Sequence, residues 1–139
     1  MIVILILSLL NYGQDPIKWD VKFETGVIKF KAIIEQDWHL YAVYCPNPND
    51  GPLPTLFSFK VNEKYSLIDS IIQETPTIKY DKNFGVDIAY YENEATFFQK
   101  IKLVDKTAIA RGDINYMTCN ETTCIPFNFP FEIKLNFQD

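Results

Sequence analysis

Short runs of apolar and aromatic residues follow one another along the chain, and polar or turn-forming residues separate them. Most of the runs are rich in β-branched and aromatic side chains, a composition that is typical of β-strands. They occupy residues 17–23, 26–35, 38–44, 55–61, 88–92, 95–104 and 131–137. No stretch keeps the period of an amphipathic helix for more than a turn or two. The pattern therefore predicts at least seven short strands.

The arrangement of these strands indicates the fold class. In the last run, residues 131–137, apolar and polar residues alternate strictly, which predicts a strand with one face in water. Seven or more strands without a long helix to connect parallel neighbours predict an all-β fold, an antiparallel β-sandwich. Residues 45–55 interrupt the pattern, because four prolines and Gly51 favour an extended and fairly rigid surface connection there.

The first residues have the pattern of an export signal. Residues 2–10 form a nearly unbroken apolar run, followed by polar residues and the small Gly13. The run is shorter than the about 20 apolar residues of a membrane span and has the length of a signal's apolar region, although no Lys or Arg precedes it. We expect residues 1–13 to be a signal peptide and residues 14–139 to be a single periplasmic or secreted domain. An ordinary first strand is the alternative.

Composition and charge narrow the class of partner. A chain of 139 residues suffices for one domain, and its 47% hydrophobic and 15% aromatic content excludes a disordered protein. The net charge is −5 and the lysines are scattered, so the chain offers no basic surface for nucleic acid. Export would place the three cysteines in an oxidising compartment, where disulfides form.

Two of the cysteines, Cys119 and Cys124, flank four polar residues. As a structural disulfide they would close a loop of six residues, which stabilises a fold by about 2 kcal/mol. As neighbouring thiols, one could attack a partner's disulfide and the other resolve the mixed disulfide. Zinc would need two more ligands, and only the distant Cys45 and His39 remain, so we expect no metal and no cofactor. The spacing alone does not separate a structural bridge from an exchange pair.

Other polar residues near these runs have plainer interpretations. The chain has one histidine and no Gly-x-Ser-x-Gly stretch, which gives no support to a serine hydrolase. We expect His39 to be a strand-edge or packed histidine. We expect Asn120 and Glu121, between the two cysteines, to be solvated turn residues.

Four segments of the chain carry a family resemblance. They are residues 15–23, residues 37–44 with 51–59, residues 80–103, and residues 112–135. The last segment is the most specific, because a tyrosine, a cysteine, a short polar bridge, a second cysteine and a proline follow in that order. These are Tyr116, Cys119, Cys124 and Pro126. Through these segments the chain resembles the N-terminal periplasmic domain of the thiol:disulfide interchange protein DsbD.

The resemblance implies an immunoglobulin-like antiparallel β-sandwich in which Cys119 and Cys124 cycle between dithiol and disulfide. It implies that a thioredoxin-like periplasmic protein or domain, in a system with a DsbD-type transmembrane protein, supplies reducing equivalents. The domain would pass them to oxidised thiol proteins, as a protein-disulfide reductase does. Tyr116 and Pro126 would support the pair.

The resemblance also implies a cap over the cysteines. In the family an aromatic ring on a loop covers the pair, and the similar stretch here is YDKNFG. Phe84 is therefore the expected cap residue, with Tyr80, Asp81 and Asn83 beside it. An apolar ring over the sulfurs would block adventitious thiols and open for a docking partner.

The chain departs from the family in three ways. Its bridge between the cysteines is slightly shorter than in the best-known members. Cys45 stands where the family requires no cysteine, which suggests a free reactive thiol, an intermolecular bond or a partly buried thiol. Neither a transmembrane portion nor a thioredoxin-like domain follows in this sequence, so we expect a stand-alone relative or a separately encoded module. The alternatives are a secreted immunoglobulin-like binding domain with a structural disulfide, and a domain that only docks a partner.

Overall fold

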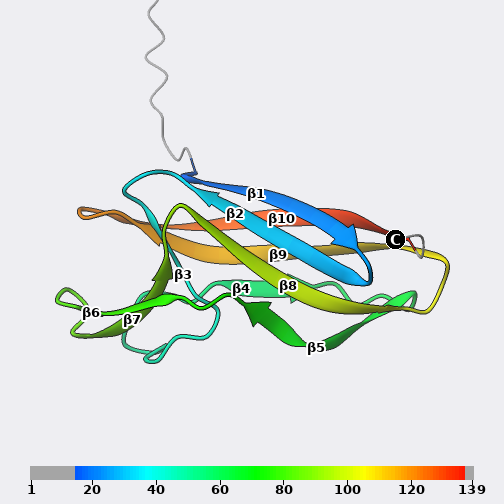
Figure 1. The fold of residues 1–139 in the computed structure, drawn as a ribbon, viewed down its shortest axis with the longest axis horizontal. Helices are drawn as coiled ribbons and strands as arrows, with labels where there is room; N and C mark the ends of the chain where they lie inside the picture. Colours follow the sequence, from blue (N-terminus) through cyan, green and yellow to red (C-terminus); the bar gives the residue numbers. More distant parts are fainter. Residues whose placement is uncertain (1–14, 137–139) are drawn as a thin grey trace, which may run out of the picture.

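The computed structural model describes residues 15–136, which form ten β-strands and no helix (Figure 1). The strands are β1 Ile17–Glu24, β2 Val27–Ile34, β3 His39–Tyr41, β4 Leu56–Phe59, β5 Tyr65–Gln73, β6 Thr77–Asp81, β7 Val86–Tyr91, β8 Glu94–Leu103, β9 Thr107–Cys119 and β10 Cys124–Asn136. All the strand pairings are antiparallel, as predicted. The predicted signal peptide, residues 1–13, lies outside the described residues. Nothing in residues 15–136 has the length and apolar character of a membrane-crossing helix.

The strands form two sheets. One sheet has four strands in the order β1-β2-β8-β5. The other has the order β10-β9-β3-β7-β6, and β4 pairs with β9 beside β3. The long strands β2, β8, β9 and β10 run along the longest dimension of the molecule (Figure 1). The strand β9 is long enough to pair with β4 and with β3 at different points along its length. It therefore connects these two short strands within the second sheet.

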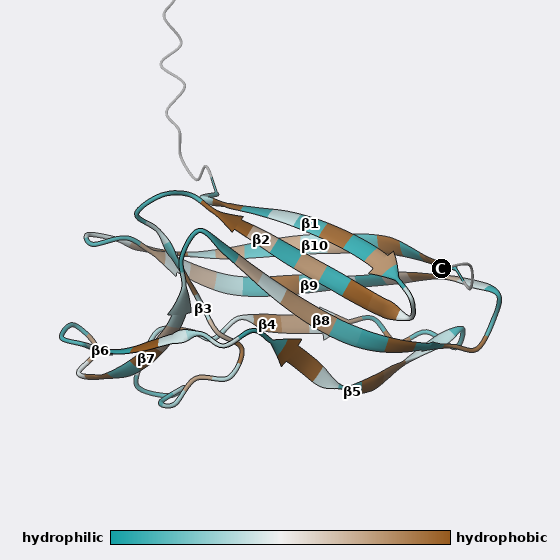
Figure 2. Ribbon diagram, in the orientation of Figure 1, coloured by the Kyte–Doolittle hydropathy of each residue, from teal (hydrophilic) through white to brown (hydrophobic). Residues whose placement is uncertain are grey.

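The hydrophobic core lies between the two sheets. Hydrophobic and polar residues alternate along β1 and β2, so each strand turns one face inward (Figure 2). Phe30 and Phe97 have no solvent exposure, and the ring of Phe57 from β4 lies 4.8 Å and 5.2 Å from theirs, centroid to centroid. Aromatic packing of this kind stabilises the sandwich through both buried area and ring geometry.

Two strands approach each other closely at Gly112 in β9. Gly112 pairs with Phe59 of β4, and a Cβ atom here would overlap the carbonyl oxygen of Ser58. It would also lie 2.7 Å from Cζ of Phe131. Glycine is therefore required at this position by the close approach of β4 and not by its backbone angles.

The structure also contains strands that the hydrophobic pattern does not predict. They are β5, β6 and β9. In β5 the alternation breaks because the register with β8 shifts between Ile68 and Ile72, and Asp69 has a positive φ of 60°. The buried Gln99 of β8 compensates, since its Nε2 donates to the carbonyl oxygens of Ile68 and Asp69, each at 3.1 Å. Residues 45–55 contain no strand, as expected.

Candidate functional site

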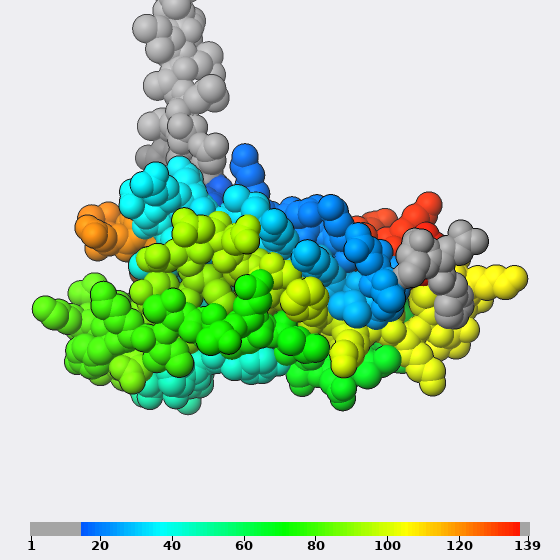
Figure 3. Space-filling model, viewed as in Figure 1, coloured from blue at the N-terminus to red at the C-terminus, as the bar shows by residue number. Residues whose placement is uncertain are grey.

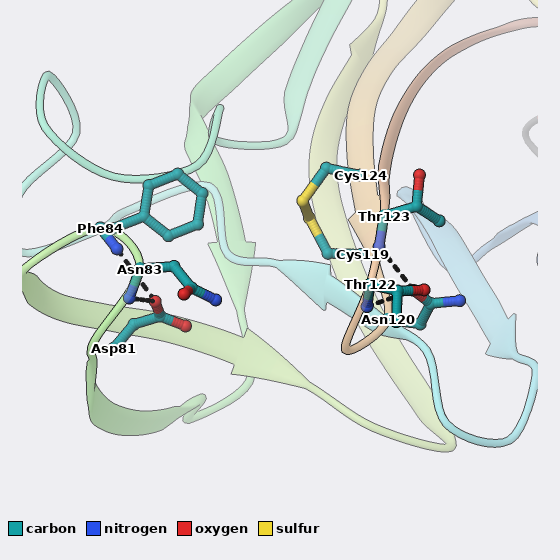
Figure 4. Close-up of a disulfide and its surroundings, with 8 residues drawn as sticks. All are labelled: Asp81, Asn83, Phe84, Cys119, Asn120, Thr122, Thr123 and Cys124. Atoms are coloured by element: carbon teal, nitrogen blue, oxygen red, sulfur yellow. Dashed lines mark hydrogen bonds between the residues drawn. A yellow bond between two sulfur atoms is a disulfide. The ribbon is translucent and has the colours of Figure 1, made fainter.

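The two cysteines close the hairpin of β9 and β10. Cys119 ends β9, Cys124 begins β10, and the two residues are direct partners in the antiparallel ladder. Their Cα atoms are 4.1 Å apart and their sulfurs form a disulfide (Figure 4). Direct partners in such a ladder point their side chains to the same face, so the register alone brings the sulfurs together.

Hydrogen bonds to Asn120 fix the turn between the cysteines. Its Oδ1 accepts from the backbone N–H of Thr122 at 3.0 Å and of Thr123 at 2.8 Å (Figure 4). Its own N–H donates to the carbonyl of Thr123 at 2.9 Å. Asparagine is suited to this place because its short amide replaces a backbone group in the turn. The residue expected to be merely solvated therefore holds the cysteines in register.

The two cysteines differ in their access to solvent. Cys119 is buried, with 4% of its surface exposed, whereas Cys124 is exposed at the start of the edge strand β10. In thiol–disulfide exchange the incoming thiolate attacks one sulfur and the other leaves. Access therefore favours attack at the sulfur of Cys124, with Cys119 as the leaving group.

A small hydrophobic cluster surrounds Cys119 on the outer face of the second sheet. Tyr41, Ile88 and Tyr90 are buried with Cys119, and Val86 and Met117 pack against the group. The pKa of Tyr41 is raised to about 12, first by burial and then by the charges of Asp81 and Tyr90. The buried sulfur thus lies in an apolar and aromatic environment, where burial raises the pKa of a reduced thiol.

The expected cap loop connects β6 to β7 at the same end of the molecule as the disulfide (Figures 1 and 3). Oδ1 of Asp81 accepts from the backbone N–H of Asn83 at 2.8 Å and of Phe84 at 3.0 Å. Gly85 completes the turn with a positive φ of 72°. The ring of Phe84 extends from this loop toward the side of the disulfide (Figure 4). Phe84 is half-buried, and within residues 15–136 it is not among the side chains packed on the Cys119 cluster.

Two other residues predicted from the resemblance lie away from the sulfurs. Tyr80 is exposed in β6, on the face opposite to that of its neighbour Asp81. Tyr116 is buried between the sheets, three residues before Cys119 and on the opposite face of β9. Its hydroxyl donates to Asp15, and burial raises the pKa of this phenol, with a further contribution from the Asp15 hydrogen bond. Tyr116 therefore supports the hairpin from within the core and not by contact with the disulfide.

Pro126 and Cys45 differ in their relation to the disulfide. Pro126 is exposed in β10, two residues after Cys124 and opposite Met117, so it shares the face of the disulfide. Cys45 is a half-buried free thiol whose Sγ donates to the carbonyl of Ala42 at 3.2 Å. Burial raises the pKa of the Cys45 thiol, which lowers its reactivity at neutral pH. Of the expectations for this residue, the structure agrees with a partly buried thiol.

The fold and the hairpin define a class of protein, an antiparallel β-sandwich with a disulfide at one end and one exposed cysteine. The family model described as "Thiol:disulfide interchange protein DsbD, N-terminal" matches residues 9–134. The chain belongs to this family, as its motifs predicted. The family is periplasmic, and membership supports a role in thiol–disulfide exchange. No curated protein sequence matches the chain.

Solved structures agree with this assignment. The reduced DsbD N-terminal domain of Neisseria meningitidis has a TM-score of 0.64 and 15% identity, over 87% of this chain and 86% of that one. The complex between the DsbD N-terminal and PilB N-terminal domains of the same species gives a TM-score of 0.63 and 14% identity, over 84% and 81%. At these identities the likeness establishes the fold, and it confirms the immunoglobulin-like β-sandwich.

Proposed function

We propose that this protein is a periplasmic thiol–disulfide exchange module in which Cys119 and Cys124 are the redox pair. One observation carries the proposal: a disulfide at the tip of a hairpin joins a buried cysteine to an exposed one. A purely structural bridge gains nothing from an exposed half, whereas an exchange pair needs one reachable sulfur. Family membership supports the same chemistry.

The exchange reaction follows from the different access of the two sulfurs. In the dithiol state the Cys124 thiolate attacks the disulfide of an oxidised protein, and a mixed disulfide forms as one partner sulfur leaves. Cys119 then attacks the Cys124 sulfur, so the bond between Cys119 and Cys124 forms and the partner departs as a dithiol. A thioredoxin-like donor reverses the cycle when its thiolate attacks Cys124 and Cys119 leaves.

The surroundings of the hairpin support docking by a protein partner. Cys124 lies at the start of an edge strand, where a partner's backbone has free access. Phe84, on the loop between β6 and β7, is the cap in this proposal, and Asp81 with Asn83 fixes the loop that carries it. The DsbD N-terminal domain of Neisseria meningitidis forms a complex with the PilB N-terminal domain. By analogy, the partners here are thioredoxin-like periplasmic proteins or domains, with a DsbD-type transmembrane protein as the source of electrons.

The reduction potential of the pair tests the proposal directly. The protein would carry Cys45→Ser, and thiol trapping in graded dithiothreitol or glutathione buffers would report the oxidised fraction. We expect a potential above about −300 mV, since structural disulfides lie below that value and exchange-active ones above it. A potential well below it would favour the alternative, a secreted immunoglobulin-like binding domain with an inert bridge.

Single-cysteine variants supply the second half of this test. Cys124→Ala should form no mixed disulfide with a thioredoxin-like partner, whereas Cys119→Ala should form one that persists, because the resolving thiol is missing. Cys45→Ala is the matched control and should exchange as the wild type does. A folded Cys119→Ala protein that completes exchange would contradict the assigned roles.

A further inference from the structure

Four side chains form one row across the strands at the disulfide end. Cys124 pairs with Cys119 across β10 and β9, and Cys119 pairs with His39 across β9 and β3. On the other side of β3, Leu40 pairs with Tyr91, which brings Glu92 opposite His39. Direct partners in antiparallel strands point to the same face. The row therefore consists of a carboxylate, an imidazole, a buried sulfur and an exposed sulfur.

The contacts of His39 hold its ring in this row. Its Nε2 lies 2.8 Å from Oε1 of Glu92, and its ring stacks on Tyr90 with the centroids 4.4 Å apart. Tyr90 in turn belongs to the buried cluster around Cys119. An imidazole that donates Nε2–H to a carboxylate keeps Nδ1 as a hydrogen-bond acceptor. A carboxylate that orients an imidazole beside a thiol is an arrangement that activates cysteine nucleophiles.

We propose that His39, oriented by Glu92, carries the proton of Cys119 during exchange. The inference rests on the proposed function, because it concerns the same redox pair. Only a thiolate attacks a disulfide, and burial in the aromatic cluster opposes ionisation of the Cys119 thiol. A nearby base would accept the proton of the buried Cys119 thiol and so allow its thiolate to form. Cys124 is exposed to water, so burial does not oppose the ionisation of its thiol. His39 begins β3 and its ring packs on Tyr90, as expected of a packed or strand-edge histidine, and the proposed role is an addition to that position.

The proton and the electron pair balance in both directions. In the resolving step, the Cys119 thiol gives its proton to the imidazole and its sulfur attacks the sulfur of Cys124. The bond between the two cysteines forms, the bond from Cys124 to the partner breaks, and the partner leaves as a thiolate with the electron pair. When a donor thiolate later attacks Cys124, Cys119 leaves as a thiolate and the imidazolium of His39 returns the proton.

Other ionisable groups share this face and bear on its pH dependence. They are Tyr41 on β3, Tyr90 on β7, Glu92 after β7, and Lys79 and Asp81 on β6. Compared with the tyrosine, carboxylate and lysine types on this face, histidine is the type whose ordinary pKa lies between about pH 5 and 8. Ionisation of the Cys119 thiol makes resolution depend on pH in every variant. A difference in pH dependence between the wild type and a His39 variant therefore reports on His39.

The mixed disulfide with glutathione isolates the resolving step. The reduced Cys45→Ser protein would react with oxidised glutathione, and acid quenching with mass spectrometry would follow the glutathione adduct over time. In His39→Gln we expect resolution to slow by about a hundredfold near pH 7, the lower end of the range for general-base catalysis. The difference should shrink as the pH rises further, because a larger fraction of the Cys119 thiol then ionises without a base beside it. Formation of the adduct at Cys124 should keep its wild-type rate.

Three further variants separate proton transfer from packing. His39→Phe keeps an aromatic ring on Tyr90 and should behave like His39→Gln. Glu92→Gln leaves the ring in place and should slow resolution by about tenfold, a smaller loss than removal of the base itself. Glu94→Gln is the matched control, because this exposed carboxylate contacts Lys31 and not His39, and it should resolve as the wild type does.

The inference would be overturned if both His39 variants and Glu92→Gln resolved the mixed disulfide at the wild-type rate. It would also be overturned if the variants lost the same factor in rate at every pH, because such a loss indicates packing. Glu92 is exposed, so Glu92→Gln decides the matter if a His39 variant does not fold. A wild-type protein that forms no mixed disulfide at all would overturn the proposed function together with this inference. A wild type that resolves normally beside an equally fast His39 variant would overturn the inference alone.

Discussion

Cys119 and Cys124 pair directly in the ladder of β9 and β10, but Cys119 is buried and Cys124 is exposed. The strands on either side of each cysteine explain this difference. Cys119 has β3 on one side and β10 on the other, so Tyr41 and Tyr90 can cover it. Cys124 lies on the edge strand, where no other strand of residues 15–136 pairs beyond it. In the proposed reaction, the roles of Cys124 as the attacking and Cys119 as the resolving sulfur would thus follow from strand order. A sequence motif can identify the pair, but it does not state which sulfur is covered.

His39 shows why part of the site could not be predicted from the sequence. The position of His39 beside Cys119 depends on the pairing of β3 with β9, two strands that are far apart in the chain. No local pattern contains that pairing.

Asn120 and Tyr80, by contrast, carried local signals in the sequence. Asparagine at the first position of a short turn often accepts backbone hydrogen bonds, as Asn120 does. Tyr80 was assigned by its nearness to Phe84 in sequence, although alternation along a strand turns it away from Asp81.

Tyr41 predicts a loss of stability at alkaline pH. Its pKa is raised to about 12, mainly by burial, so the fold favours the neutral phenol. A raised pKa contributes stability that is complete below the unfolded value of about 10 and is lost as the pH rises toward about 12. We expect the free energy of unfolding, measured by urea denaturation, to fall across this interval. In Tyr41→Phe the fall should be less steep, because one of the titrating groups is gone.

The exposed Tyr80 provides the control for this experiment. Tyr80→Phe should leave the alkaline slope as it is in the wild type, since little of its side chain is removed from water. Burial also raises the pKa of Tyr91 and Tyr116, so a residual slope is expected in Tyr41→Phe. An unchanged slope in Tyr41→Phe would contradict the prediction.

At the scale of elements, the hairpin of β9 and β10 dominates the molecule, and the sequence predicts only its final part. Both strands have 13 residues, but the predicted strand begins at Phe131. The first half of β10 contains Pro126 and Pro130, which cannot donate to a ladder and which lower the strand propensity. They are tolerated because β10 is an edge strand with one unpaired side. The position of β10 at the edge of the sheet cannot be read from the sequence. It explains why the first half of this strand was not predicted.

Gly112 predicts how sensitive this hairpin is to crowding. In Gly112→Ala the new Cβ would overlap the Ser58 carbonyl and press on the ring of Phe131, so β4 or β10 must shift. We expect a loss of about 3 kcal/mol in the free energy of unfolding by urea, in the upper range for an overpacked site. Thr107→Ala, at an exposed position of the same strand, should cost less than about 1 kcal/mol. Equal stability of Gly112→Ala and the wild type would refute the close approach.

At the scale of the whole molecule, the fold class could be predicted because it depends on strand number and on the lack of long helical patterns. The order of the strands could not be predicted, since β9 pairs with three separate parts of the chain, β3, β4 and β10. The aromatic core likewise joins β2 and β8 of one sheet to β4 of the other, segments that are far apart in the chain. The resemblance supplied the immunoglobulin-like arrangement that periodicity alone did not.

The sandwich should fold without its disulfide. The bridge closes a loop of six residues, so the double variant Cys119→Ala/Cys124→Ala should lose only about 2 kcal/mol of unfolding free energy. Circular dichroism and urea denaturation of this variant, beside the oxidised wild type, would measure the difference. The reduced wild type is the control and should match the variant closely. A variant without a cooperative unfolding transition would show that the bridge is structural.

The small size of the ring closed by the disulfide also determines what a partner can recognise. A difference of about 2 kcal/mol corresponds to about 40 mV for a two-electron couple, so folding and oxidation state are only weakly linked thermodynamically. In the proposed redox cycle, reduction therefore changes the stability of the sandwich only slightly. We expect a partner to distinguish the dithiol from the disulfide form at the hairpin tip, where the bond between Cys119 and Cys124 is made and broken, and at the loop between β6 and β7 at the same end of the molecule.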